Sequence, residues 1–137
     1  MLKSWTMALA AMIVSVPAMA GAKVVMKSDA DILGNKISYP DGQAEITSVV
    51  AVQKPGECNG WHSHPVPTFG LVRKGELTVR YQNGDTKHLK AGDMLIEVQN
   101  MGHEGCNTGS EDLEVLVFYA GSDSVPNTIK MEDQRPH

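Results

Sequence analysis

The amino-acid sequence predicts an all-β protein, a single jelly-roll or sandwich domain of two antiparallel sheets that follows an N-terminal targeting segment. Short apolar segments recur at roughly 8 to 12-residue spacing and are separated by turns rich in Gly, Pro and Asn, a pattern typical of β-sandwiches and barrels. No segment with helical periodicity and the length of a helix follows the targeting segment, and no internal repeat is present. One β domain accounts for the remaining chain.

Residues 1–20 are predicted to be a secretory signal peptide. One lysine precedes an apolar run from Trp5 to Val16, and a proline then leads into the small-residue pattern Ala18-Met19-Ala20. Cleavage is expected after Ala20, with Ala20-Gly21-Ala22 as a second candidate site. A retained membrane anchor is disfavoured, because a bilayer span needs about 20 apolar residues. We therefore expect an exported protein, periplasmic or secreted, with no stable membrane anchor after cleavage.

The charge of the mature chain limits its partners. Cleavage leaves 117 of the 137 residues, which suits one compact domain, with 11 basic and 16 acidic side chains and a formal charge of −5. This acidic balance argues against nucleic acid or an anionic membrane surface as a partner. We expect a small-molecule ligand or substrate, and we leave a homodimer open.

The domain is expected to have three parts. Residues 21–43 carry turn signals but no sustained apolar period, and they are predicted to be an irregular extension. Residues 44–121 are predicted to form the barrel, beginning with a strand over Glu45–Gln53 whose apolar residues lie on both faces, so that both faces should be partly buried. Residues 122–137 are polar and are expected to be a tail that is either mobile or laid along a sheet edge.

The remaining strands follow from alternating apolar residues and turn signals. Asn83-Gly84 is the strongest hairpin signal and predicts a type I′ turn, with positive φ at both positions. A loop over Gln99–Gly102 is predicted to deliver His103. Besides the first, the predicted strands are Trp61–His64, Phe69–Val72, Glu76–Tyr81, Asp85–Leu89, Met94–Val98 and Leu113–Tyr119.

Histidines are the candidate metal ligands. His62 and His64 are one residue apart on a predicted strand, so their side chains point to the same face and form half of a metal site. His103 is the best candidate for a third ligand. The alternative is that these are three unrelated polar histidines. His88 lies outside this group, between Lys87 and Lys90, and is interpreted as a solvated surface histidine.

The spacing of these histidines and of the glycines around them resembles the two sequence motifs of the cupin family. The first motif, in which glycine and five residues precede His-x-His, is matched by Gly56, His62, His64 and Gly75, and the second by Gly92, His103 and Asn107. Three residues depart from the family pattern: Thr68 stands in place of the usual metal-binding glutamate, Val98 in place of proline and Asn100 in place of glycine. The resemblance covers roughly residues 44–121 and implies a cupin-type jelly-roll barrel.

The resemblance implies a divalent metal ion bound by His62, His64 and His103. Fe(II) is favoured, and Mn, Ni, Cu or Zn are alternatives. Thr68 cannot replace a carboxylate, and it is expected either to pack and bond to the backbone or to reach the ion through water. Of the nearby carboxylates, Glu104 adjoins His103 and should point to the opposite face, whereas the sequence does not place Glu97.

The two cysteines, Cys58 and Cys106, raise the question of a disulfide, because exported proteins with an even number of cysteines often form them. In cupins the His-x-His strand runs antiparallel beside the strand of the second-motif histidine, and that register implies that the cysteines are near neighbours. Their sequence distances from His62 and His103 differ by one residue, so a bulge has to reconcile their faces. A disulfide, two free thiols and a redox-active pair near the metal are the three alternatives.

Two functions are compatible with the sequence. The first is a small exported cupin that binds a divalent metal through three histidines and acts as a mononuclear non-haem dioxygenase on a small organic substrate. The second is a barrel that binds a metal or small ligand without catalysis. A degenerate site on a barrel that serves as an interaction surface is a third alternative, because of the departures at Thr68, Val98 and Asn100. Fold alone does not separate them.

Overall fold

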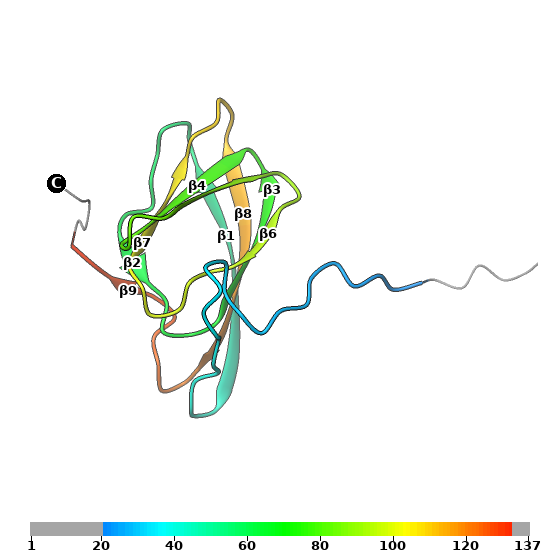
Figure 1. The fold of residues 1–137 in the computed structure, drawn as a ribbon, viewed down its shortest axis with the longest axis vertical. Coiled ribbons are helices and arrows are strands. Elements are labelled where there is room, and N and C mark those ends of the chain that lie inside the picture. The colour runs from blue at the N-terminus through cyan, green and yellow to red at the C-terminus, as the bar shows by residue number, and fades with distance from the viewer. Residues whose placement is uncertain (1–20, 133–137) are drawn as a thin grey trace, which may run out of the picture.

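Residues 21–132, which the computed structural model describes, form nine strands in two antiparallel sheets and contain no helix (Figure 1). One sheet has the strand order β1-β8-β3-β6 and the other β5-β4-β7-β2-β9. The strands are β1 (Ala44–Gln53), β2 (His62–Ser63), β3 (Thr68–Lys74), β4 (Glu76–Tyr81), β5 (Thr86–Lys90), β6 (Met94–Ile96), β7 (His103–Asn107), β8 (Leu113–Ser122) and β9 (Ile129–Lys130). The predicted all-β jelly roll is confirmed.

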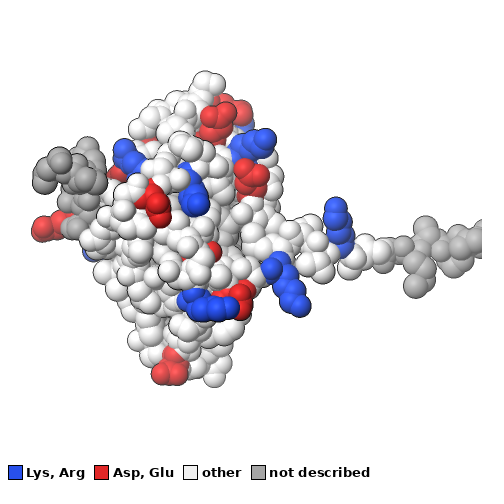
Figure 2. Space-filling model, in the orientation of Figure 1, with Lys and Arg blue, Asp and Glu red and all other residues white. Residues whose placement is uncertain are grey.

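The predicted signal peptide, residues 1–20, lies outside the described residues, as do residues 133–137. Within the described range, no helix is long and apolar enough to cross a membrane. On the face shown in Figure 2, lysine and arginine side chains are interspersed with acidic ones. Charges of opposite sign therefore lie beside one another on this face.

The hydrophobic core lies between the two sheets. The alternation predicted for β4 holds, since Leu77, Val79 and Tyr81 point inward and are at most 6% exposed. Strands of both sheets add Val72, Leu89, Leu95, Leu113 and Val115 to the cluster, and Val98 joins it from the segment after β6. Burial of this shared apolar surface holds the two sheets together.

The β4–β5 hairpin forms where the sequence predicts it, but its turn differs from the predicted type. Gly84 has a φ of 93°, whereas Asn83 does not have positive φ, so the type I′ prediction is wrong. The Gly84 N–H donates to the carbonyl of Tyr81, and the Tyr81 N–H donates to that of Asp85, each at 2.9 Å. This is the pattern of a three-residue hairpin loop in which a turn is followed by a left-handed glycine.

The exposure of strand β1 contradicts a second prediction. The side chains of Ile46, Val50 and Val52 share its outer face and are 67%, 49% and 58% exposed, so this face is not partly buried as predicted. Val49 and Ala51, on the opposite face, line the cavity between the sheets, so this face points outward, and among residues 21–132 no segment covers it. Apolar residues on both faces of a strand therefore indicate burial of both faces only when another layer of the protein packs against each of them.

Both terminal segments pack on the barrel. In the extension, the Ile32 N–H donates to the carbonyl of Ile96 at 2.8 Å, which attaches this segment to strand β6, and Ile32 and Leu33 contact the core. Near the C-terminus, β9 pairs with β2 at the sheet edge, and Lys130 lies opposite His62. Figure 1 shows the chain crossing the barrel before β1 and returning to β2 at β9.

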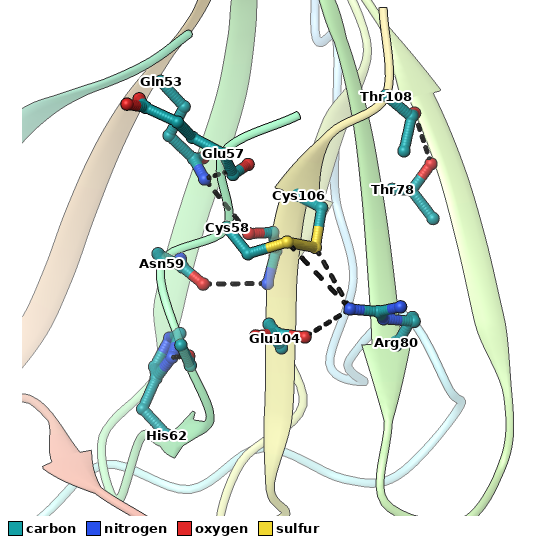
Figure 3. The surroundings of a disulfide bond; sticks show 12 residues. Gln53, Glu57, Cys58, Asn59, His62, Thr78, Arg80, Glu104, Cys106 and Thr108 are labelled. Atoms are coloured by element: carbon teal, nitrogen blue, oxygen red, sulfur yellow. Dashed lines mark hydrogen bonds and ion pairs between the residues drawn. A yellow bond between two sulfur atoms is a disulfide. The ribbon is translucent and has the colours of Figure 1, made fainter. Parts of the chain in front are cut away.

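A disulfide joins Cys58 and Cys106, whose Cα atoms are 4.0 Å apart. It links the segment before β2 to β7 (Figure 3). Cys58 pairs with Cys106 and His62 with His103, so the register shifts by one residue between the two pairs. The intervening Gly60 has a φ of 78°, and the irregular backbone there reconciles the faces of cysteines and histidines.

Arg80 stands beside the disulfide on the outer side of the sheet. Its Nη2 lies 3.4 Å from the Cys106 sulfur and 4.0 Å from that of Cys58, and it also pairs with the Glu104 carboxylate (Figure 3). Glu104 therefore points to the face opposite the neighbouring His103, as the alternation of a strand requires. This places Glu104 outside the histidine cluster.

Asn100 occupies the position where cupins usually have glycine, and the structure explains why asparagine is accepted. Its φ is 60°, the left-handed region, which asparagine adopts more readily than other residues with a Cβ. Its backbone N–H donates to the carbonyl of His64 at 2.9 Å. Val98, in the usual place of proline, is fully buried in the core. Both departures therefore preserve the local fold.

We predict that replacing both cysteines (Cys58→Ser with Cys106→Ser) lowers the free energy of unfolding by up to about 4 kcal/mol. The disulfide closes a loop with a sequence separation of 48, and this is the chain-entropy value for such a loop. Urea unfolding of the parent and the variant measures it, and thiol titration of the unfolded parent before reduction should find no free thiol. Two free thiols in that titration would contradict the assignment.

We predict that Asn100→Val lowers the free energy of unfolding by about 1–2 kcal/mol, because a β-branched residue is strained at positive φ. Asn100→Gly is the matched control and should keep the stability of the parent within about 0.5 kcal/mol. Thermal or urea unfolding compares the three proteins. Equal losses in the valine and glycine variants would show that the asparagine side chain, and not the backbone, is what matters.

Candidate metal centre

The structure brings His62, His64 and His103 together inside the barrel. His62 lies in β2 and pairs with His103, the first residue of β7, while His64 follows two residues after His62. One ligand nitrogen from each of the three rings lies within 4.8 Å of the other two. His103 thus begins β7 directly after residues 99–102, the loop predicted to deliver it.

Each of the three imidazoles is oriented by a backbone carbonyl. The Nδ1 atoms lie 2.7 Å from the carbonyl of Gly60 for His62 and 2.8 Å from that of Asn127 for His64. For His103 the partner is the carbonyl of Met101, at 2.9 Å. A carbonyl only accepts hydrogen bonds, so each Nδ1 carries the proton and each Nε2 offers a lone pair. This is the orientation in which histidines bind metal ions.

Burial keeps these imidazoles neutral. His64 and His103 are 4% and 1% exposed, and burial lowers the pKa of His64 to about 4 and that of His103 to about 3. Burial also lowers the pKa of His62, although the Gly60 carbonyl opposes the effect. Neutral imidazole is the metal-binding form, so protons compete weakly for these nitrogens near neutral pH.

A cavity of about 80 Å³ adjoins the three histidines. Its walls are mostly apolar, and its remaining polar lining includes Thr68, Glu97 and Tyr119. A more open groove of about 400 Å³, which includes Lys130, shares three residues with the cavity: Asn59, His62 and Tyr119. The groove therefore meets the cavity beside His62.

Thr68 lines this cavity at the family's glutamate position. It is 1% exposed, and its hydroxyl donates to the carbonyl of Val66 at 3.1 Å. This hydroxyl bonds to the loop that contains two prolines, which is one of the two roles expected for it. The side chain is too short and too weak an acceptor to act as a carboxylate ligand.

Glu97 is the carboxylate that the sequence could not place, and it lies in the cavity. Its Oε2 is 3.7 Å from Nε2 of His103, and neither of these buried atoms has a hydrogen-bond partner among residues 21–132. Burial raises the pKa of Glu97 to about 7. Its backbone N–H donates to the carbonyl of Thr68 at 2.8 Å, so the two residues face each other across neighbouring strands.

The C-terminal segment is the part of the site that the sequence did not reveal. It provides the carbonyl of Asn127 to His64, and the Thr128 hydroxyl lies 3.3 Å from the same Nδ1. The Met131 N–H donates to the carbonyl of Trp61, one residue before His62. These contacts use mainly backbone atoms, which any residue has, so no pattern of side chains could have indicated them.

The donor set fits a divalent metal ion. Three Nε2 lone pairs converge on the cavity, and imidazole is a common ligand of iron, zinc, copper and nickel. Leaving a buried acceptor such as Nε2 of His103 without a partner costs about 1–3 kcal/mol. An ion bound by the three nitrogens would remove this cost.

The comparison with known families agrees with the motifs and with the fold. A sequence model of the cupin domain matches residues 49–119, which is just over half of the chain. The chain belongs to the cupin family. A search of curated proteins finds no match.

Solved structures share the cupin fold. A protein of Klebsiella pneumoniae with a double-stranded β-helix domain superposes with a TM-score of 0.56 and 24% identity, over 71% of this chain and 91% of that one. Bacillus subtilis oxalate decarboxylase, which has Mn(II) centres, superposes with a TM-score of 0.53 and 23% identity, over 65% of this chain and 24% of the decarboxylase chain. A dimethylsulfoniopropionate (DMSP) lyase of Ruegeria pomeroyi superposes with a TM-score of 0.54 and 19% identity, over 63% of this chain and 43% of the lyase chain. The cupin chain therefore spans about a quarter of the decarboxylase and less than half of the lyase.

We predict that Glu97→Gln stabilises the metal-free protein more at pH 8 than at pH 5. The pKa of Glu97 is raised from an ordinary 4.5 to about 7, so between these values the folded state holds a proton that the unfolded state has released. The stability of the parent therefore falls as pH rises through this window, by on the order of 3 kcal/mol, and glutamine removes this dependence. Urea unfolding in chelator at both pH values measures the difference. The same difference in stability between parent and variant at both pH values would contradict the raised pKa of Glu97.

Proposed function

We propose that this cupin is a mononuclear metal enzyme, in which a divalent ion held by Nε2 of His62, His64 and His103 acts on a small organic molecule. The observation that carries the proposal is the common orientation of the three imidazoles, each with Nδ1 on a backbone carbonyl and Nε2 toward its neighbours. The reaction class we assign is that of a non-haem dioxygenase, the chemistry available to cupins with three-histidine iron sites.

Fe(II) is the metal we favour. When bound, it supplies the redox chemistry of an oxygenase, and three protein ligands leave up to three octahedral positions open. Mn(II) is the alternative, because the structurally similar oxalate decarboxylase has Mn(II) centres. The residues of the chain hold the imidazoles neutral by burial, and the apolar walls limit the access of water to the site.

The size of the cavity restricts the substrate. A volume of about 80 Å³ admits a ligand of only a few non-hydrogen atoms beside the three histidines. Small thiols and short carboxylates fit this space, whereas flavonols would require the walls to move. Lys130 places a positive charge in the outer groove next to His62, which favours the approach of an anionic molecule.

We also propose that the protein works outside the cytoplasm, in the periplasm or as a secreted protein. The signal-peptide pattern of residues 1–20 supports this, and so does the disulfide between Cys58 and Cys106, because structural disulfides persist in oxidising compartments. Fractionation of cells that produce the full chain, followed by mass measurement of the mature N-terminus, tests it. Intact chain recovered in the cytoplasm would contradict it.

We predict that His62→Ala, His64→Ala and His103→Ala each weaken divalent-metal binding by at least about 100-fold, because each removes one of three protein ligands. His88→Ala is the control, since this exposed histidine lies outside the cluster and should leave binding unchanged. Elemental analysis of purified protein and calorimetric titration with Mn(II) measure the effect. Equal metal content in the parent and the three ligand variants would refute the site.

The reaction class is tested by oxygen consumption of the Fe(II)-loaded protein with thiols, diketones, catechols and flavonols. Uptake is expected with small substrates, and it should disappear in His103→Ala. A protein that binds the metal but consumes no oxygen with any of these compounds would instead be the non-catalytic binding barrel.

A further inference from the structure

Two buried acceptors face each other at the edge of the histidine cluster. Oε2 of Glu97 lies 3.7 Å from Nε2 of His103, which is too long for a hydrogen bond, and within the part of the chain that the structure describes neither atom has another partner. Because Nδ1 of His103 carries the ring proton, Nε2 offers a lone pair, as an ionised carboxylate oxygen also does. Two lone pairs that converge in a buried site are stabilised by a cation between them.

We propose that Glu97 is a fourth protein ligand of the metal and supplies the carboxylate that other cupins place at the position of Thr68. This inference rests on the proposed metal site, and it changes the character of that site. The carboxylate comes from the segment after strand β6, in place of the first residue of β3.

The pairing of β3 with β6 explains how the exchange is possible. Phe69 lies opposite Ile96, and the Glu97 N–H donates to the carbonyl of Thr68, so residues 68 and 97 are adjacent across the two strands. Both side chains line the same cavity. Thr68 is short and turned to the carbonyl of Val66, and the longer side chain of Glu97 reaches toward His103.

The observed distance is near the range for two ligands of one ion. With metal–ligand bonds of about 2.1 Å, two donors lie about 3.0 Å apart at a right angle and about 3.4 Å apart at the tetrahedral angle. The separation of 3.7 Å between Glu97 and His103 therefore needs to close by less than about 1 Å. Glu97 is not among the residues whose ligand atoms all lie within 4.8 Å of one another, so its side chain has to rotate toward His62 and His64 as well when the ion binds.

The added carboxylate alters the charge and the open positions of the centre. Three neutral imidazoles leave a divalent ion with its full charge of about +2, and Glu97 lowers this to about +1. One octahedral position is also filled, so up to two stay available for substrate and dioxygen. The chain thus has the usual ligand set of three histidines and one carboxylate, although Thr68 suggests that the carboxylate is lost.

The test measures the affinity of the purified protein for Mn(II) alone, by calorimetry and by the electron paramagnetic resonance signal of free Mn(II). We expect Glu97→Gln to bind Mn(II) at least about 10-fold more weakly than the parent, since glutamine keeps the shape but not the anionic oxygen. Glu97→Asp keeps the charge but shortens the reach by one methylene, and we expect it to lose affinity as well. The resonance of bound Mn(II) should change in both variants.

Two further variants separate ligation from other effects. Glu104→Gln removes the same charge one residue from His103, but on the face that holds Arg80, and it should leave the affinity within about 3-fold of the parent. Combining Thr68→Glu with Glu97→Gln moves the carboxylate back across the strands, and it should regain affinity over Glu97→Gln alone. Unfolding curves of the metal-free proteins confirm that each variant is folded.

The outcomes distinguish this inference from the proposed function. A parent that binds no divalent metal refutes the function itself. A parent that binds Mn(II), with Glu97→Gln equal to it in affinity and in resonance, overturns only the assignment of Glu97. Full affinity in Glu97→Asp combined with a loss in Glu97→Gln would also overturn it, because a charge that acts through space does not depend on one methylene.

Discussion

The cluster of three histidines depends on the antiparallel pairing of β2 with β7, which sets His62 directly opposite His103. This pairing consists of a single register pair in a strand of two residues, so β2 cannot hold its own position. Its neighbours hold it: β7 is paired over five residues with β4, β9 covers the other edge, and the disulfide fixes Cys58 to β7. A slip of one residue would turn the histidines of β2 out of the cavity, which is why a short strand needs three supports.

The orientation of the histidines comes from backbone carbonyls. Two of the three carbonyls, those of Gly60 and Met101, lie two residues before the histidine they bind, so each of these ligands is oriented by its own loop. The third comes from Asn127 in the C-terminal segment, 63 residues away from His64. The predicted tail thus supports the histidine cluster, and the folding of residues 127–131 against β2 is coupled to the geometry of that cluster.

Charge inside the cavity follows from the same burial. Low exposure keeps His64 and His103 neutral and holds the pKa of Glu97 high, so the metal-free cavity is a poor place for any ionised group. A divalent ion at the proposed site would reverse this, because it would give the buried lone pairs a partner and favour the ionised carboxylate. Binding of the proposed ion would therefore be coupled to the stability of the barrel.

The sequence by itself determined the strands whose side chains alternate, such as β4, and the hairpin at Asn83-Gly84, because these depend on local periodicity and on the conformations allowed to each residue. Its motifs also identified the three histidines and both departures, Val98 and Asn100, that the fold tolerates.

Only the tertiary structure decided what depends on neighbours distant in the chain. The outer face of β1 is exposed because no segment of residues 21–132 packs over it. Strand β7, which is buried but has little apolar content, forms because β2 and β4 pair with it. The carboxylate in the cavity comes from Glu97, because the register of β3 with β6 sets it beside Thr68, and register is a property of two strands that neither sequence segment contains alone.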